Sequence, residues 1–212
     1  MAGLATPWRR DRADGCRLSE EPNGRGPGGG ERSTIVIDDD VRRHWPPLPT
    51  AAAFGTTLFV LWLLVRASTG DRFVPIVDHA NLAFHEAGHL LVGLVSGHLS
   101  VYGGTLGQLF FPVATAWHFA RRRHSLGFAL AAGWACESAL NVATYMGDAR
   151  ALQLPLIGDL DPETHHDWRE ILSRWGWLEA DTTLALLTSL AAWGAGLALS
   201  FWVMRRWLDG RT

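Results

Sequence analysis

The sequence predicts an all-α integral membrane protein, a helical bundle of four or five transmembrane helices that follows a polar N-terminal tail. Two observations carry this prediction. Four stretches are apolar over nearly the length that a helix needs to cross a hydrocarbon core, about 20 residues. The mean hydropathy is only +0.05, because long apolar runs are averaged with a very polar beginning of the chain.

Residues 1–49 form the first predicted domain, a polar and largely disordered tail. Residues 1–34 are rich in Gly and Pro and have almost no apolar periodicity. They cannot bury enough surface to offset their chain entropy, so we expect them to be disordered. No secretory signal precedes the first apolar run, which we therefore expect to be a retained anchor.

Residues 50–212 form the second predicted domain, a helical membrane domain. Its four apolar stretches are 50–66, 76–98, 125–147 and 183–204. A fifth stretch, 105–120, is shorter and contains Pro112, so a span, a re-entrant segment and an interfacial loop are all open. The arginines near the spans divide eight to five in a four-span and in a five-span chain alike. The positive-inside rule thus orients either chain but does not choose between them.

A polar loop over about 149–182 separates the last two main stretches. Asp161-Pro162 and Thr164 are typical signals of a helix start. Apolar side chains then recur at helical spacing, at Trp168, Ile171, Leu172, Trp175 and Leu178. This pattern predicts a short helix in the membrane interface, with its tryptophans at the level of the headgroups.

Charge and cysteine content exclude two classes of function. The 19 basic residues face 21 acids, which gives a net charge of −2 and argues against a nucleic-acid partner. Cys16 lies in the polar tail and Cys136 in an apolar run, so these two cysteines cannot form a disulfide framework or a thiolate zinc site. Any metal in this protein must be bound by His and carboxylate side chains.

The segment His85-Glu86-Ala87-Gly88-His89 lies within the second apolar stretch. On a helix, residues four apart share a face, so His85 and His89 can present two imidazoles to one Zn²⁺ ion while Glu86 points toward a water molecule. Polar groups of this kind are costly in hydrocarbon and are functional by default. The motif therefore predicts a zinc site in which Glu86 is the general base.

Two polar stripes are predicted to meet in the bundle. One follows the helix of the histidines at Asp78, Asn81, His85, His89 and Ser96. The other follows the stretch 125–147 at Gly133, Glu137, Asn141, Thr144 and Asp148. Such stripes must face protein, not lipid. Gly88, Gly93 and Gly97 are small residues of the same stretch, and Gly93 with Gly97 forms a GxxxG pair. We expect these glycines to serve plain helix packing.

A catalytic zinc ion needs at least one further protein ligand. Glu137 and Asp148 are the carboxylates that the second stripe offers, and His165, His166 and Asp167 in the loop are a third possibility. Glu137 matches the histidines in depth for either span count. Asp148 comes near His85 only if the two helices are antiparallel, which requires four spans. For His166 and Asp167 we favour a plainer role, the polar first turn of the interfacial helix.

The segment Phe84-His85-Glu86-Ala87-Gly88-His89 in an apolar helix resembles the site-2 protease family of intramembrane zinc proteases. That family has a second motif, an Asn before a metal-binding Asp, which Asn141 and Asp148 resemble at a spacing of seven residues where eight is usual. The resemblance implies that Asp148 is the third ligand, ahead of Glu137, and that Asn141 contacts the substrate or the developing oxyanion. The chain also resembles a family of small bacterial membrane proteins of no established activity over most of 78–181, through Gly103-Gly104-Thr105-Leu106-Gly107-Gln108-Leu109, Asp148-Ala149-Arg150 and His166-Asp167-Trp168.

These observations predict a zinc metalloprotease of the bacterial inner membrane whose partners are the lipid bilayer and a membrane-protein substrate. Two other functions are open. One is a non-proteolytic membrane protein with a structural or regulatory metal site, and the other is a metal hydrolase of a non-peptide substrate. A structural site would be closed by four side chains, whereas a catalytic site keeps one position for water.

Overall fold

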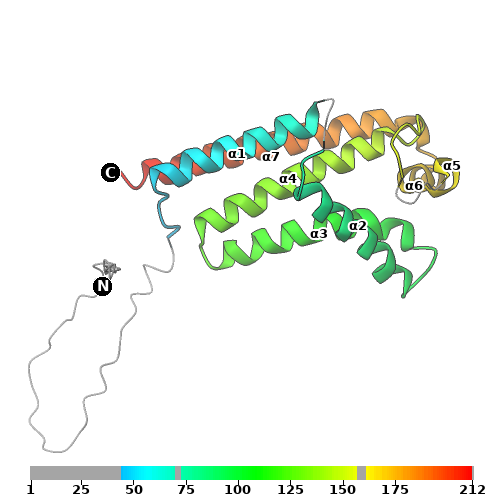
Figure 1. Ribbon diagram of the computed structural model, residues 1–212, viewed down its shortest axis with the longest axis horizontal. Coiled ribbons are helices and arrows are strands. Elements are labelled where there is room, and N and C mark those ends of the chain that lie inside the picture. Colours follow the sequence, from blue (N-terminus) through cyan, green and yellow to red (C-terminus); the bar gives the residue numbers. More distant parts are fainter. Residues whose placement is uncertain (1–43, 70–72, 157–160, 212) are drawn as a thin grey trace, which may run out of the picture. The chain divides into compact units, whose positions relative to one another are not determined.

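The computed structural model describes residues 44–69, 73–156 and 161–211, and every regular element in them is helical. The long helices are α1 (Thr50–Ser68), α2 (Val77–Gly93), α3 (Ser100–Arg121), α4 (Ser125–Gly147) and α7 (Asp181–Leu208) (Figure 1). Between α4 and α7 lie the short elements α5 (Pro162–His165), α6 (Asp167–Trp175) and the 3-10 turn η1 (Leu178–Ala180). The all-α prediction is confirmed for the described residues.

The core lies where α1, α4 and α7 pack together. Val60 and Leu64 of α1 meet Leu140 of α4 and Val203 of α7, all at most 3% exposed. In the described part of the chain, three helices are long and apolar enough to cross a membrane: Thr50–Ser68, Ser125–Gly147 and Leu178–Leu208. These three account for the predicted stretches 50–66, 125–147 and 183–204.

One end of the bundle gathers the beginnings of α1 and α4 and the end of α7. The Ser125 hydroxyl donates to the carbonyl of Pro46 over 2.6 Å, and the Leu48 amide donates to the carbonyl of Arg206 over 3.3 Å. Helices α1 and α4 therefore run in the same direction and α7 runs against them. Most of the predicted tail, up to residue 43, lies outside the described residues, but Leu48 is already buried in the core.

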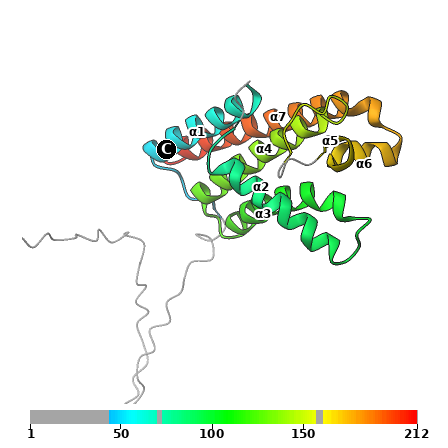
Figure 2. The ribbon, with the colours of Figure 1, turned by 45° about the vertical axis from the view of Figure 1, so that its right-hand side comes forward.

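Helices α2 and α3 form a hairpin that packs on α4 through α3 (Figure 2). The stretch 105–120 is part of a continuous 22-residue helix that includes Gly103, Gly104 and Pro112. A Cβ atom built on Gly88 would lie 2.0 Å from the carbonyl oxygen of Gly103, so the two backbones touch there. The expected packing role is confirmed for Gly88. A Cβ atom on Gly93 would lie 3.3 Å from the Ser100 hydroxyl oxygen, so Gly93 also packs against α3. Gly97 has no such role, because α2 ends at Gly93 and a Cβ on Gly97 would meet nothing within 4 Å.

The predicted loop helix is present as α5 followed by α6. Asp161 caps α5 by accepting a hydrogen bond from the Glu163 amide, as the Asp-Pro signal predicts. The apolar face of α6 packs onto the end of α4, where Leu172 is fully buried against Val142, Met146 and Ala149. This docking brings the first residue of α6 to the hairpin.

Candidate metal centre

Three ligand atoms from two distant segments converge on one point. The Nε2 atoms of His85 and His89, one turn apart on α2, are 3.1 Å from each other. The Oδ2 atom of Asp167, the first residue of α6, lies 2.9 Å from the first and 3.0 Å from the second. In the described residues these three side chains form a group that could hold a metal ion.

The outer partners of the imidazoles fix which nitrogen carries hydrogen. His89 Nδ1 lies 2.8 Å from the carbonyl oxygen of Ser100, which can only accept, so this nitrogen donates. His85 Nδ1 faces the side-chain oxygen of Gln108 at 3.4 Å. In the neutral rings both Nε2 lone pairs then point at each other and at a carboxylate oxygen. Three acceptors that face one another need a proton or a cation between them.

The size of the triangle suits a small cation with tetrahedral ligands. Zinc bonds of about 2.0–2.1 Å place tetrahedral ligand atoms about 3.3 Å apart. The observed separations of 2.9 to 3.1 Å reach that value with shifts of a few tenths of an ångström. The side chains of His89 and Asp167 keep 23% and 11% of their surface exposed, so water can reach the fourth position. The residues therefore fit a zinc ion with an open position.

Two residues of the Gly-rich segment on α3 shape this centre. A Cβ atom on Gly104 would lie 2.5 Å from the Nε2 atoms of both His85 and His89. Glycine is thus required there for the imidazoles to lie against α3. One turn further along α3, the buried Gln108 contacts His85 from the other side. Gly104 and Gln108 of the segment Gly103 to Leu109 thus lie against the candidate metal ligands, which the sequence alone did not indicate.

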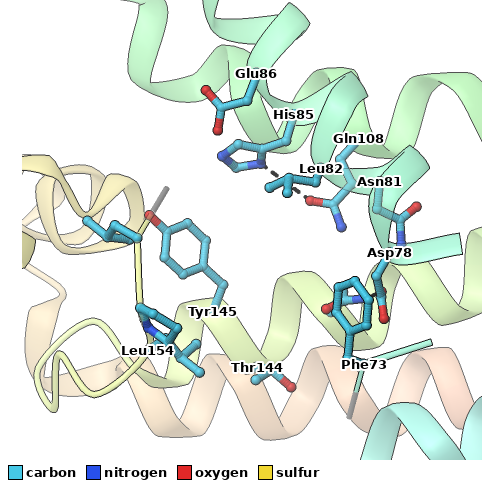
Figure 3. A pocket seen from close by; sticks show the side chains of 13 residues that line it. Phe73, Asp78, Asn81, Leu82, His85, Glu86, Gln108, Thr144, Tyr145 and Leu154 are labelled. Carbon is cyan, nitrogen blue, oxygen red and sulfur yellow. Dashed lines mark hydrogen bonds between the residues drawn. The ribbon is translucent and has the colours of Figure 1, made fainter. Parts of the chain in front are cut away.

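Glu86 is exposed and lines a cavity of about 330 Å³ together with His85 (Figure 3). The opposite wall comes from Tyr145 of α4 and from the segment Leu154-Pro155-Leu156. Polar and apolar side chains both line the cavity, with Leu82 near His85 and Phe73 near Asp78 (Figure 3). A substrate group in this cavity would lie beside both a candidate base and a candidate metal ligand.

The two polar stripes meet, as predicted, but away from the histidines. Glu137 is fully buried and accepts hydrogen bonds from the amides of Asn81 at 2.8 Å and Asn141 at 2.7 Å. The Asn141 amide also donates to Asp78. Glu137 is thus satisfied within a hydrogen-bonded network, and the structure does not bring it to the imidazoles. Asn141 lines the cavity from this network.

Asp148, the third ligand that the family resemblance favours, lies elsewhere. Its carboxylate accepts hydrogen bonds from the backbone amides of Gln153 at 2.9 Å and Leu154 at 3.0 Å. It also lies 3.5 Å from Nε2 of the buried His166. His166 is the N-cap of α6 and accepts from the Arg169 amide. These two residues therefore support the loop that carries Asp167.

Asp167 combines the two roles that the sequence left open for it. It forms the first turn of α6, the role that we favoured, and it is also the carboxylate nearest to the histidines. Burial acts to raise the pKa of Asp167, but hydrogen bonds to His85 and His89 outweigh burial and hold the pKa below its usual range. Asp167 is therefore ionised at neutral pH, as a metal ligand must be.

Comparisons with models of protein families, with curated proteins and with solved structures found no match.

Proposed function

We propose that this chain is a membrane-embedded zinc metalloprotease that hydrolyses peptide bonds in or near the membrane. The observation that carries the proposal is the convergence of His85, His89 and Asp167 beside Glu86. Catalytic zinc sites have three protein ligands and one open position, whereas structural sites are closed by four. Among the described residues, no fourth His, Cys, Asp or Glu joins the group. This coordination favours hydrolysis over a structural role.

A zinc ion at this point would polarise a water molecule and lower its pKa toward about 7. Glu86 follows His85 directly and faces the cavity, where it can accept the proton of the attacking water. The same carboxyl group can then give that proton to the leaving amine. Asn141 and Gln108 lie in the cavity wall, where their side chains can contact the substrate.

The outer surface of the hairpin supports membrane embedding of the centre. Large apolar side chains of α2 and the following turn are strongly exposed, with Leu94 at 86% and Val95 at 84%. The exposed apolar side chains of α3 are Leu106, Phe110, Val113 and Trp117. Contiguous apolar surface of this kind is typical of contact with lipid or with another protein.

We propose four membrane crossings, in which α3 joins the three helices that are long and apolar enough to cross, those of α1, α4 and α7. Because α1 and α4 run in the same direction, the chain must return once between them. Helix α3 has 22 residues, about 33 Å in length, and a three-residue turn joins it to the start of α4. Helix α2 is shorter, and its first turn already contacts Asn141 near the far end of α4. We therefore place α2 only part of the way across.

The charge of the cavity favours a peptide over a phospholipid as the substrate. Two carboxylates, those of Asp78 and Glu86, line it, and none of the described residues around it is Lys or Arg. A phosphate group would meet negative charge there with no cationic side chain to bind it. The amide and carboxylate oxygens of the wall instead suit the N–H groups of an unwound peptide segment.

The test compares membrane-protein fragments in cells that contain the wild-type protein or the Glu86→Gln variant. Glutamine keeps the size of the side chain but cannot take a proton from water, so turnover should fall by about 10²–10⁴-fold while zinc remains bound. New protein N-termini that occur only with the wild type support the proposal. Identical fragments in both cells, with zinc bound in both, would reject peptide hydrolysis and leave the metal site in place.

A further inference from the structure

Tyr145 connects α4 to both segments that carry the metal ligands. Its ring centroid lies 4.1 Å from that of His166, the residue before Asp167, and 5.9 Å from that of His85. Its hydroxyl oxygen accepts a hydrogen bond from the backbone amide of Asp167 over 3.1 Å. The same side chain lines the cavity opposite Glu86 (Figure 3).

The hydrogen bond to Asp167 meets a need of the helix itself. Asp167 is the first residue of α6, and the amides of a first helical turn have no partner within the helix. The Tyr145 hydroxyl supplies the missing acceptor. Since the amide and the carboxylate belong to the same residue, holding the amide restricts where the carboxylate can lie.

We infer that Tyr145 is a positioning residue that sets Asp167 in place as the third metal ligand. The inference rests on the proposed metal centre and adds a residue that acts through a ligand. Docking of α6 does not depend on this hydroxyl, because Ile171 and Leu172 are buried against the bundle on their own. Loss of the hydroxyl should therefore loosen the carboxylate without releasing the helix.

The test measures Co²⁺ binding to the full-length protein in detergent by the visible absorption of the ion. Tyr145→Phe keeps the ring and removes only the oxygen atom. Loss of an outer partner of a ligand weakens metal binding by about 10–100-fold, and we expect that loss together with an altered Co²⁺ spectrum. The matched control is Tyr102→Phe, at the other of the two tyrosines of the chain. Tyr102 also contacts α6, through Trp175 and Arg174, but is not bonded to Asp167, so its variant should bind Co²⁺ as the wild type does.

Wild-type affinity and spectrum in Tyr145→Phe, alongside lost binding in Asp167→Ala, would overturn this inference and leave the metal centre intact. Equal losses in both tyrosine variants would also overturn it, because the effect would then not depend on Asp167. A wild-type protein that binds no Co²⁺ would overturn the metal centre and the role of Tyr145 together. If Tyr145→Phe does not fold, hydrogen exchange of the Asp167 amide in the wild type decides. A protected amide supports the inference, and rapid exchange rejects it.

Discussion

Replacing Asp167 with alanine should remove the metal from the protein and leave the helices in place. The three ligand atoms lie 2.9 to 3.1 Å apart, and alanine deletes the one that carries a negative charge. Structural zinc sites with four ligands contribute about 10–16 kcal/mol, so one ligand contributes about 2.5–4 kcal/mol. That free energy corresponds to a loss of about 10²–10³-fold in zinc affinity. The Leu172 contacts that dock α6 do not involve the carboxylate.

Asp148→Ala is the matched comparison, because the family resemblance favours that residue as the ligand. Its carboxylate holds the amides of Gln153 and Leu154 and approaches only His166. We expect its loss to weaken zinc binding by no more than about 10-fold, the lower range for an outer partner. Zinc affinity would be measured by competition with a chelator of known strength. Full retention of zinc in Asp167→Ala together with its loss in Asp148→Ala would refute the assignment.

Two further predictions concern space and protons at the same centre. Gly104→Ala should lower zinc affinity at least about 10-fold, because its methyl group would lie 2.5 Å from the Nε2 atoms of both histidines. The control is Gly55→Ala, whose Cβ meets nothing within 4 Å and which should leave the zinc content unchanged. Equal zinc content in the two variants would show that the space at Gly104 does not matter for metal binding. A zinc ion would compete with protons for the imidazole nitrogens, so its affinity should fall as the pH falls. An affinity that does not change between pH 8 and pH 5, measured by the same competition, would show that the histidines are not ligands.

The arrangement of the residues of α2 could be predicted from the sequence, because it depends on their spacing within one helix. The spacing of His85 and His89 fixes both on one face of α2, and the same periodicity correctly predicts that Asn81 and Glu137 meet. Segment lengths likewise indicated the helices α1, α4 and α7. Within each helix the pattern relates residues a few positions apart, so the pattern contains the geometry of that helix. The meeting of the two stripes at Asn81 and Glu137 follows from a second rule, that polar stripes in a membrane bundle must face protein.

The third carboxylate could not be chosen in this way. Asp167 follows His89 by 78 residues in the sequence. It reaches the two histidines because α6 folds back onto the end of α4. Depth in the membrane ranks only carboxylates on spanning helices, whereas Asp167 lies in the segment between α4 and α7. The motif His166-Asp167-Trp168 was the signal that could have found it, since it places a His and an Asp together at a helix start.

The docking of α6 has a consequence for how a metal ion would be held. Two ligands belong to the hairpin of α2 and α3 and the third to a nine-residue helix, so a bound ion would cross-link separate parts of the chain. Short, sparsely buried segments open locally at a much lower free energy than the core of a bundle does. Release of the ion would therefore be governed by the opening of α6 and not by unfolding of α1, α4 and α7. The metal occupancy of the site and the susceptibility of α6 to proteases would then both report the equilibrium between docked and opened α6.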